Sequence, residues 1–424
     1  MAFRMALYGW PISQCQSRST PLATQLVDGI RVLDVRLALV PTRRGTGERS
    51  ATAPTVDFKL VAYHGIYPQR TPFKTILEAL HAFLTSPEGC KETIVMSIKQ
   101  EDFTLSSPIL FSRLVKEEIM SSPGGFKDTD SNGNRDLGMW FLENRVPKLG
   151  EVRGKVVLFS RFGVNGEHWE GGWEGLGIHP LHWPNSDKRG FLWYLKGLPI
   201  RTHDWYAIPS FLSIPEKATL STLVLDQRIF FPIELPYNPE EVEKQKRAEE
   251  NFQVMLNITY MSAAAFPLAL PPTVAMGAGW PGFKVGFEGV NSRFGRWLLE
   301  ELVPDLKAAS PIKAAGAPET VENGYGAVKQ KSERPAEVGA AKTSAKGRGQ
   351  GLRWLRGKHG KDESKADLIA VQEQSAEEAQ LPMSRATRLR GWVLLDYYAS
   401  EAALIPLLVE FNYHGRNSGE EGWP

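Results

Sequence analysis

The chain has 424 residues, of which 42% are hydrophobic, and a formal net charge of +2. This length allows one large domain with insertions, and the small net charge excludes a strongly basic nucleic-acid-binding protein. No apolar run approaches the roughly 20 residues that cross a bilayer. Cys15 and Cys90 are the only cysteines, which excludes a disulfide framework and a cysteine-based zinc site and favours a reducing compartment.

Two apolar runs near the start of the chain end in polar residues. Residues 29–37 read Gly-Ile-Arg-Val-Leu-Asp-Val-Arg-Leu, and residues 60–65 read Leu-Val-Ala-Tyr-His-Gly. Both runs predict buried strands that deliver Asp34, Arg36 and His64 at or near their ends. The arginine offers a planar fork of donors to phosphate oxygens, and the histidine exchanges a proton near neutral pH. The pattern therefore indicates a phosphodiester site. The alternative is a structural ion pair between Arg36 and Asp34 beside a histidine that caps a turn.

Strands and helices alternate along the following residues. Thr71-Pro72 predicts a helix start with a capping hydroxyl, and the helix after it has an apolar stripe made of Ile76, Leu77, Leu80, Phe83 and Leu84. Further strands are expected at 93–99, 155–162, 198–206, 254–260 and 392–398, and further helices at 111–120, 290–302 and 401–411. This alternation predicts an α/β fold with a mostly parallel sheet whose faces are covered.

Residues 307–388 differ in composition from the rest of the chain. They are rich in Ala, Gly, Lys, Glu, Ser and Gln and poor in bulky apolar residues, so we expect a disordered insertion. Its basic stretch 346–359 contains one tryptophan, Trp354, and either contacts anionic lipid headgroups or is a solvated run of charge. The expected domain therefore comprises residues 1–306 and 389–424.

Six motifs along the chain share the order of those in a known family. They are Asp34-Val35-Arg36, His64-Gly65, the strand 95–99 that ends in Lys99, the segment 153–162 that contains Arg161, Asp204-Trp205-Tyr206, and Asp396-Tyr397. In this respect the chain resembles the X-domain family of phosphatidylinositol-specific phospholipases C, in its metal-independent bacterial branch and the related phospholipase-C-like phosphodiesterases of fungi. The resemblance implies a TIM-type (β/α) barrel.

The resemblance also implies a role for each matched residue. Arg36 would bind phosphate, with Asp34 orienting it, and His64 would be the general acid. Asp396 would orient the histidine that acts as general base. The implied contacts with the inositol ring are made by Lys99, Arg161, Asp204 and Tyr206.

The general-base histidine is the one family feature that the sequence lacks. Family members carry it in a Gly-Thr-His-Asp segment on the first strand, whereas residues 8–14 here already resemble the region immediately after that segment. We therefore expect a start that falls after the histidine, and a distorted barrel without its first strand. The barrel would be open between the strand of Asp34 and the strand of Asp396.

The implied reaction is attack of the inositol 2-hydroxyl on phosphorus, with Arg36 replacing the calcium ion of the animal-type branch. We expect no metal or other cofactor, an inositol phospholipid or glycosylated inositol lipid as substrate, contact with a membrane surface, no nucleic-acid partner and a monomer. The location would be cytoplasmic or peripheral to a membrane.

Two other functions stay open. The missing base allows a catalytically inactive protein that binds lipid headgroups. A metal-dependent glycerophosphodiesterase or a sphingomyelinase-D-like barrel would need an additional carboxylate cluster near His64.

Overall fold

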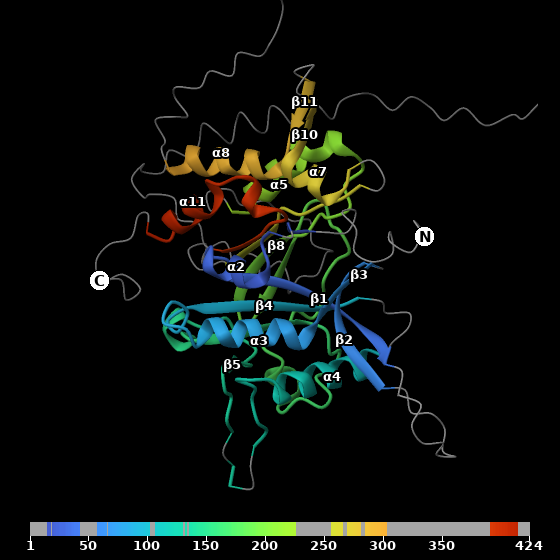
Figure 1. Ribbon diagram of the computed structural model, residues 1–424, viewed down its shortest axis with the longest axis vertical. Coiled ribbons are helices and arrows are strands. Elements are labelled where there is room, and N and C mark those ends of the chain that lie inside the picture. Colours follow the sequence, from blue (N-terminus) through green and yellow to red (C-terminus); the bar gives the residue numbers. More distant parts are fainter. Residues whose placement is uncertain are drawn as a thin grey trace, which may run out of the picture. The chain divides into compact units, whose positions relative to one another are not determined.

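The computed structural model describes residues 15–17, 19–42, 57–65, 67–101, 107–129, 132–133, 135–225, 256–265, 269–280, 285–302 and 391–413 (Figure 1). All of them belong to one unit, Met1–Ala309 with Ala386–Pro424. The other unit, Ser310–Arg385, lies outside the described residues, and so does the whole of the expected insertion 307–388.

The first sheet has the strand order β3-β2-β1-β4-β6-β5. Its strands are β1 (Val32–Thr42), β2 (Asp57–His64), β3 (Tyr67–Pro72), β4 (Thr93–Gln100), β5 (Trp140–Phe141) and β6 (Lys155–Arg161). β1, β4, β6 and β5 are parallel neighbours. β2 and β3 are antiparallel to their neighbours, so the sheet is mixed, with its parallel strands on one side of β2.

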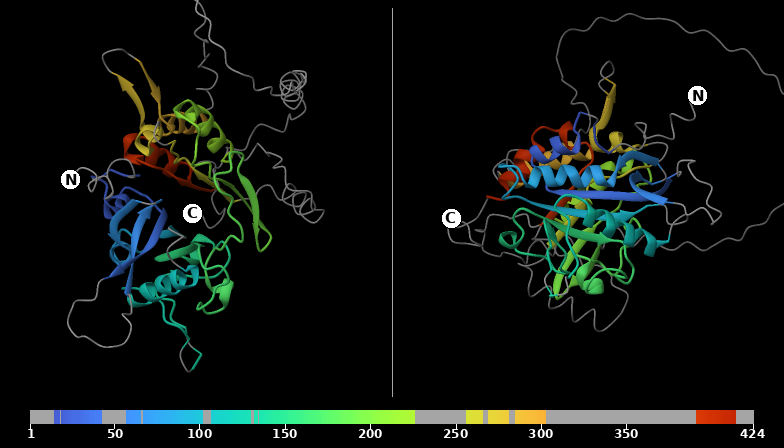
Figure 2. Two further views of the ribbon diagram at one scale, coloured as in Figure 1. Left: turned by 90° about the vertical axis from the view of Figure 1, so that its right-hand side faces the viewer. Right: turned by 60° about the horizontal axis from the view of Figure 1, so that its bottom comes forward.

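The second sheet has the order β12-β9-β8-β7, and a two-stranded sheet pairs β10 with β11. The strands are β7 (Phe191–Leu195), β8 (Leu198–His203), β9 (Leu256–Tyr260), β10 (Gly277–Trp280), β11 (Val285–Glu288) and β12 (Gly391–Leu394). β8, β9 and β12 are parallel, whereas β7 and β8 form an antiparallel pair. Figure 2 shows β10 and β11 projecting as a narrow hairpin beyond the neighbouring helices.

The architecture is mixed α/β with parallel strands in two sheets, but the described strands do not close into a barrel. Within the described residues, no strand pair joins the sheet of β1 to the sheet of β12. β1 pairs with β4 over Val32–Leu37 and with β2 over Leu37–Thr42, so among the described strands the β2 side of its first half has no strand partner. The expected α/β class is therefore correct, and the TIM-type barrel is not formed.

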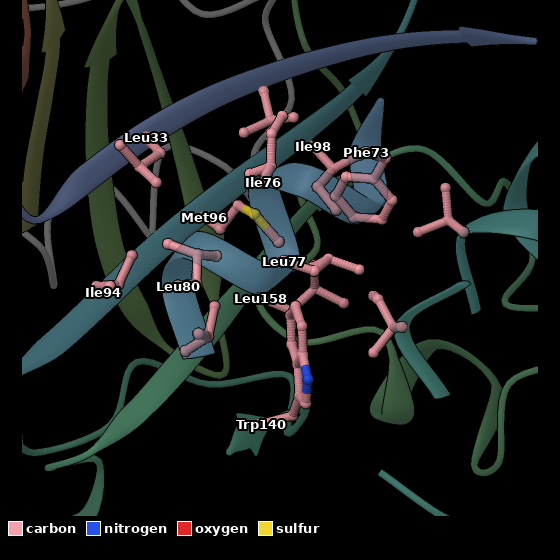
Figure 3. Close-up of a cluster of buried hydrophobic side chains, with 14 of the residues drawn as sticks. Leu33, Phe73, Ile76, Leu77, Leu80, Ile94, Met96, Ile98, Trp140 and Leu158 are labelled. Carbon is pink, nitrogen blue, oxygen red and sulfur yellow. The ribbon is translucent and has the colours of Figure 1, made fainter. Parts of the chain in front are cut away.

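Helix α3 (Phe73–Leu84) packs against the first sheet through its apolar stripe. Ile76, Leu77, Leu80, Phe83 and Leu84 are all buried, as the sequence predicted. Figure 3 shows the side chains of this helix beside those of the strands β1, β4 and β6. The predicted cap is wrong, because Thr71 belongs to β3 and the residue at the helix N-cap, Pro72, makes no side-chain cap hydrogen bond.

The remaining helices of the described residues are six α-helices and four short 3-10 helices. They are α2 (Leu22–Val27), α4 (Pro108–Ser121), α5 (Ile214–Leu223), α7 (Pro271–Met276), α8 (Val290–Leu302) and α11 (Leu404–Glu410), with short 3-10 helices at Leu149–Glu151, Gly172–Gly175, Phe211–Ser213 and Tyr398–Ser400. α5, α7, α8 and α11 contribute to a second apolar core. None of the described helices has the length and apolar character needed to cross a bilayer.

Candidate active site

The parallel strands of the first sheet bring five polar side chains into register near one edge. Asp34 is level with Ser97, and Arg36 is level with Lys99. Lys99 is in turn level with Arg161 on β6. Because parallel strands place their carboxyl ends at the same edge of a sheet, charged residues from three distant parts of the sequence lie side by side there.

His64 reaches the same edge from the opposite direction. β2 returns antiparallel along the end of β1, with Leu37 opposite Ala62. β2 ends two residues further on, at His64, which lines the same cavity as Asp34 and Arg36. The last residue of this antiparallel strand therefore lies at the site.

Asp34 is the centre of a buried charge cluster. Its carboxylate accepts hydrogen bonds from Arg36 Nε at 3.0 Å and from Ser97 Oγ at 3.0 Å. It also pairs with Arg161 at 3.4 Å. Burial opposes ionisation of this carboxyl, but the two arginines outweigh burial and lower its pKa to about 2. Asp34 is therefore an anion at any physiological pH.

Arg36 is held between two carboxylates. Besides Asp34, it donates from a terminal nitrogen to Glu101 Oε1 at 3.3 Å. Burial lowers the pKa of the guanidinium, but Asp34 and Glu101 more than offset that effect and raise it. Glu101 also lies 3.8 Å from the Lys99 ammonium, whose pKa is lowered by burial and by Arg36. Glu101 thus links two of the predicted ligand-binding cations.

Arg161, on β6 of the first sheet, forms ion pairs with an aspartate of each sheet region. Its guanidinium pairs with Asp34 on β1 and, at 3.6 Å, with Asp204 just after β8. It also donates to the Tyr260 hydroxyl at 3.1 Å. The side chains of Arg161 and Asp204 are only 4% and 3% exposed, so this pair is shielded from bulk water.

A cavity of about 1330 Å³ runs between β1 and β12, from the amino ends of these strands at Val32 and Gly391 to the charged edge at Arg36 and Asp396. Of the predicted site residues, those that line it are Asp34, Arg36, His64, Tyr206 and Asp396. Lys99, Arg161 and Asp204 are not among its lining residues, and they connect to it through the ion pairs of Asp34 and Arg36. Five of the eight predicted residues therefore line the cavity, and the other three are linked by ion pairs to Asp34 or Arg36.

Asp396 is buried beside Cys15 on the β12 side of the cavity. Burial raises the pKa of this carboxyl to about 7, although Arg36 and a hydrogen bond from Cys15 lower it. The thiol of Cys15 is 3.5 Å from His64 Nδ1, and burial together with Asp396 raises its pKa well above the usual value. Cys15 is consequently a neutral thiol, and it contacts both His64 and Asp396.

Hydrogen bonds to backbone groups hold the turn that carries Asp396. The buried amide of Asn291 on α8 donates to the carbonyls of Asp396, at 2.9 Å, and Tyr397, at 3.1 Å. Tyr397 has a left-handed φ of 47°, a conformation that a bulky residue adopts only when its surroundings impose it. Its amide donates to the carbonyl of Cys15 at 2.8 Å. Three separate segments therefore meet to position one carboxyl group.

Sequence reasoning missed several of these contacts. Glu101 lies two residues after the predicted strand 93–99, so its position at the strand end was a usable signal. Asn291 gave none, because a residue on a helix face reveals its partner only in three dimensions. His203, which directly precedes Asp204, is buried between Ser221 Oγ and the carbonyl of Lys188.

Within the described residues, no group of three or more His, Cys, Asp or Glu side chains is arranged to hold a metal ion. The positive groups at the cavity edge are side chains of the protein, chiefly Arg36.

Comparison with known proteins gives a limited result. No family model matches the chain, and no curated protein sequence matches it. Solved structures of phosphatidylinositol-specific phospholipase C from Staphylococcus aureus resemble parts of it. One, described for its membrane binding, is 17% identical over 71% of this chain and 78% of its own, with a TM-score of 0.39. A pentafluoro-phenylalanine form is 16% identical over 72% and 78%, with a TM-score of 0.40.

Proposed function

We propose that the cavity is the active site of a metal-independent phosphodiesterase that cleaves inositol phospholipids. The observation that carries the proposal is that Arg36 on β1, His64 at the end of β2 and Asp396 in the turn after β12 line one cavity. If Arg36 and Asp34 formed only a structural ion pair, nothing would require His64 and Asp396 to line the same cavity. The ordered sequence motifs supply independent support.

In this proposal Arg36 binds the nonbridging oxygens of the phosphate. Asp34 and Glu101 hold its guanidinium from two sides, so its orientation is set before substrate binds. A preorganised cation stabilises the charge that develops on a pentacoordinate phosphorus without reorganising during the reaction.

His64 acts as the general acid. The 2-hydroxyl of the inositol ring attacks phosphorus, the bond from phosphorus to the diacylglycerol oxygen breaks, and that oxygen takes its proton from His64. The products are diacylglycerol and a cyclic inositol phosphate. Proton donation by a positioned side chain contributes roughly 10²- to 10⁴-fold to the rate.

Asp396 is the candidate for accepting the proton of the attacking hydroxyl. A general base works best when its pKa lies near the operating pH, and burial raises the pKa of this carboxyl to about 7. In the family pattern the corresponding carboxyl acts through a histidine, whereas here the described neighbour is Cys15. We propose that Asp396 takes up the proton directly.

The experiment is release of water-soluble phosphate ester from phosphatidylinositol vesicles in excess chelator, monitored by phosphorus NMR. We expect a cyclic phosphate product, no effect of the chelator, and a fall of about 10²- to 10⁴-fold in kcat for His64→Ala. His182→Ala, at an exposed position of the loop before β7, is the matched control and should keep full activity. Activity that disappears in chelator and returns with calcium contradicts the proposal.

Binding of a lipid headgroup without turnover is the second candidate function. It is favoured by the surroundings of Asp396, because Cys15 occupies the space between this carboxyl and His64 as a neutral thiol. A protein of this kind binds inositol phosphate through Arg36 and releases no product in the vesicle assay. The two functions therefore differ in one measurable outcome.

A further inference from the structure

The cavity continues well beyond the charged residues of the candidate active site. It runs from Arg36 and Asp396 to Val32 and Gly391, at the amino ends of β1 and β12. At about 3.3 Å per strand residue, the stretch from Arg36 to Val32 adds roughly 13 Å of length. We propose that this additional part binds an acyl chain of the substrate lipid. The proposal rests on the proposed function and names the part of the substrate that occupies the rest of the cavity.

The lining of this part is largely apolar and incompletely buried, and we call it the apolar cleft. It comes from α2 and the segment that follows it, from the starts of β1 and β12, and from α11. Its half-buried side chains are Leu22, Ile30, Val32, Trp392, Ile405 and Leu408. A contiguous group of accessible apolar side chains often marks a ligand-binding groove. Because burial of apolar surface is favourable, these side chains are better matched to an apolar ligand than to water.

Two contacts connect the walls of the apolar cleft. The hydroxyl of Tyr398, after β12, donates to Oδ2 of Asp28, at the end of α2, at 2.6 Å. The next residue, Gly29, has a φ of 105°, and a Cβ there would lie 3.2 Å from Cγ2 of Ile405 on α11. Glycine therefore permits both the backbone conformation and the close approach of α11. The cleft is thus formed by packed elements before a ligand binds.

The proposed reaction places the lipid part of the substrate at the entrance to the cleft. His64 donates its proton to the oxygen that carries the glycerol and its acyl chains, and it lines the same cavity as Ile30 and Ile405. The phosphate is at Arg36, so the glycerol lies beside the charged end of the cavity. An acyl chain that enters the cleft from there replaces water along the apolar lining. One molecule with an anionic group and an apolar chain therefore matches both parts of the cavity.

Charged side chains mark the far end of the cleft. Arg31, Lys91, Glu92 and Arg153 line the cavity near the amino ends of β1, β4 and β6. Arg31 pairs with Glu92 at 2.9 Å, and Arg153 donates to the carbonyl of Lys91 at 2.9 Å. The apolar lining ends at these groups, so a chain gains affinity from the cleft only up to this point.

Monoalkyl phosphates test the proposal, because they combine an anionic group and an apolar chain in one soluble molecule. Ethyl, butyl, hexyl and octyl phosphate are titrated in chelator by calorimetry, each below its micelle concentration. We expect the dissociation constant to fall by up to about fourfold for each methylene group that the cleft buries. Affinity that is independent of chain length overturns the assignment and leaves the cleft to water or to a protein segment.

Substitutions that fill the cleft locate the chain. The measured quantity is the ratio of the dissociation constants of ethyl and octyl phosphate, because damage to the fold or to the phosphate site affects both constants. Leu408→Trp should lower this ratio by at least about 10-fold, since the larger ring occupies the space of several methylene groups. Val409→Trp, at a lining position on α11 that is 41% exposed, tolerates the larger side chain more easily and should lower it by at least about threefold.

Leu299→Trp is the matched control. Leu299 on α8 is also 41% exposed, but it does not line the cavity. The ratio in this variant should stay within about twofold of wild type, as for a surface substitution away from the site. A ratio that all three tryptophan variants lower equally, or that none of them lowers, overturns the assignment of the chain to the cleft.

The vesicle assay separates this inference from the proposed function. If the ratio changes as expected while wild type releases no cyclic phosphate from phosphatidylinositol vesicles, the proposed function fails, and the substrate assigned to the cleft fails with it. If wild type releases the product while chain length has no effect on the binding of alkyl phosphates, the proposed function stands and the acyl-chain site is overturned.

Discussion

The surroundings of two buried aspartates in the site shift their pKa values in opposite directions. Asp34 has two arginine partners and a pKa of about 2, whereas burial is the largest effect on Asp396 and raises its pKa to about 7. The sequence identified both residues by their places in the ordered motifs. Glu101 was missed although its place just after a predicted strand was a usable signal, whereas the contact of Cys15 depends on how separate segments come together and has no signal in the sequence.

Asp396 should make stability fall as pH rises. Its pKa in the folded protein lies above the usual 3.8, so between about pH 4 and 7 the folded state binds more protons than the unfolded state. Asp396→Asn removes this effect and should stabilise the protein at pH 8 by up to about 4 kcal/mol, with little change near pH 4. Urea unfolding of both proteins at the two pH values measures the difference. A variant less stable than wild type at pH 8 contradicts the burial argument.

Asp34 should have the opposite pH dependence. Its folded-state pKa is lowered from 3.8 to about 2, so its contribution is complete above about pH 4 and is lost as pH falls toward 2. Asp34→Asn should reduce the free energy of unfolding at pH 7 by about 2 kcal/mol, and the deficit should disappear near pH 2. Denaturation curves across this range test it, and a deficit that does not change with pH would point to packing instead.

At the scale of elements, periodic apolar patterns were the most informative part of the sequence. Helix α8 occupies Val290–Leu302 as predicted, and α3 buries its predicted stripe. Strand direction was harder to predict from the sequence, because the apolar run before His64 has the same composition whether β2 is parallel or antiparallel. The predicted strand 392–398 ends at Leu394, since Tyr397 adopts a left-handed conformation that a strand does not accommodate.

The packing of α3 on the sheet can be measured directly. Leu77 is fully buried among the side chains drawn in Figure 3. Leu77→Ala should lower the free energy of unfolding by about 2–5 kcal/mol through lost burial and the cavity left behind. Ile109→Ala on α4, where the side chain is 47% exposed, should change it by less than about 1 kcal/mol. Chemical denaturation provides both values, and comparable losses would contradict the packing described.

At the scale of the whole molecule, two mixed sheets and their helices flank a cavity edged with charge. The sequence predicted the α/β class, because alternating apolar patterns are local features, and the roles of the site residues stay a prediction. It also predicted an opening between the strand of Asp34 and the strand of Asp396, and no described strand pair joins β1 to β12. It did not predict the second break, between the sheet that ends in β5 and the sheet that ends in β7, because pairing between strands distant in sequence leaves no local signal. Residues 307–388 lie outside the described part of the chain, so their disorder stays a prediction.

The central claim is that Arg36 makes this cavity a phosphate-binding site. Calorimetric titration with inositol 1-phosphate, in chelator, tests it most directly on wild type, Arg36→Ala and the control Arg145→Ala, whose side chain pairs with Glu143 and Glu151 on the surface. We predict binding by wild type and by the control, and a dissociation constant at least about 10-fold higher for Arg36→Ala, as for loss of a charged hydrogen bond. Absence of binding by wild type, or equal affinity of Arg36→Ala, would contradict the account.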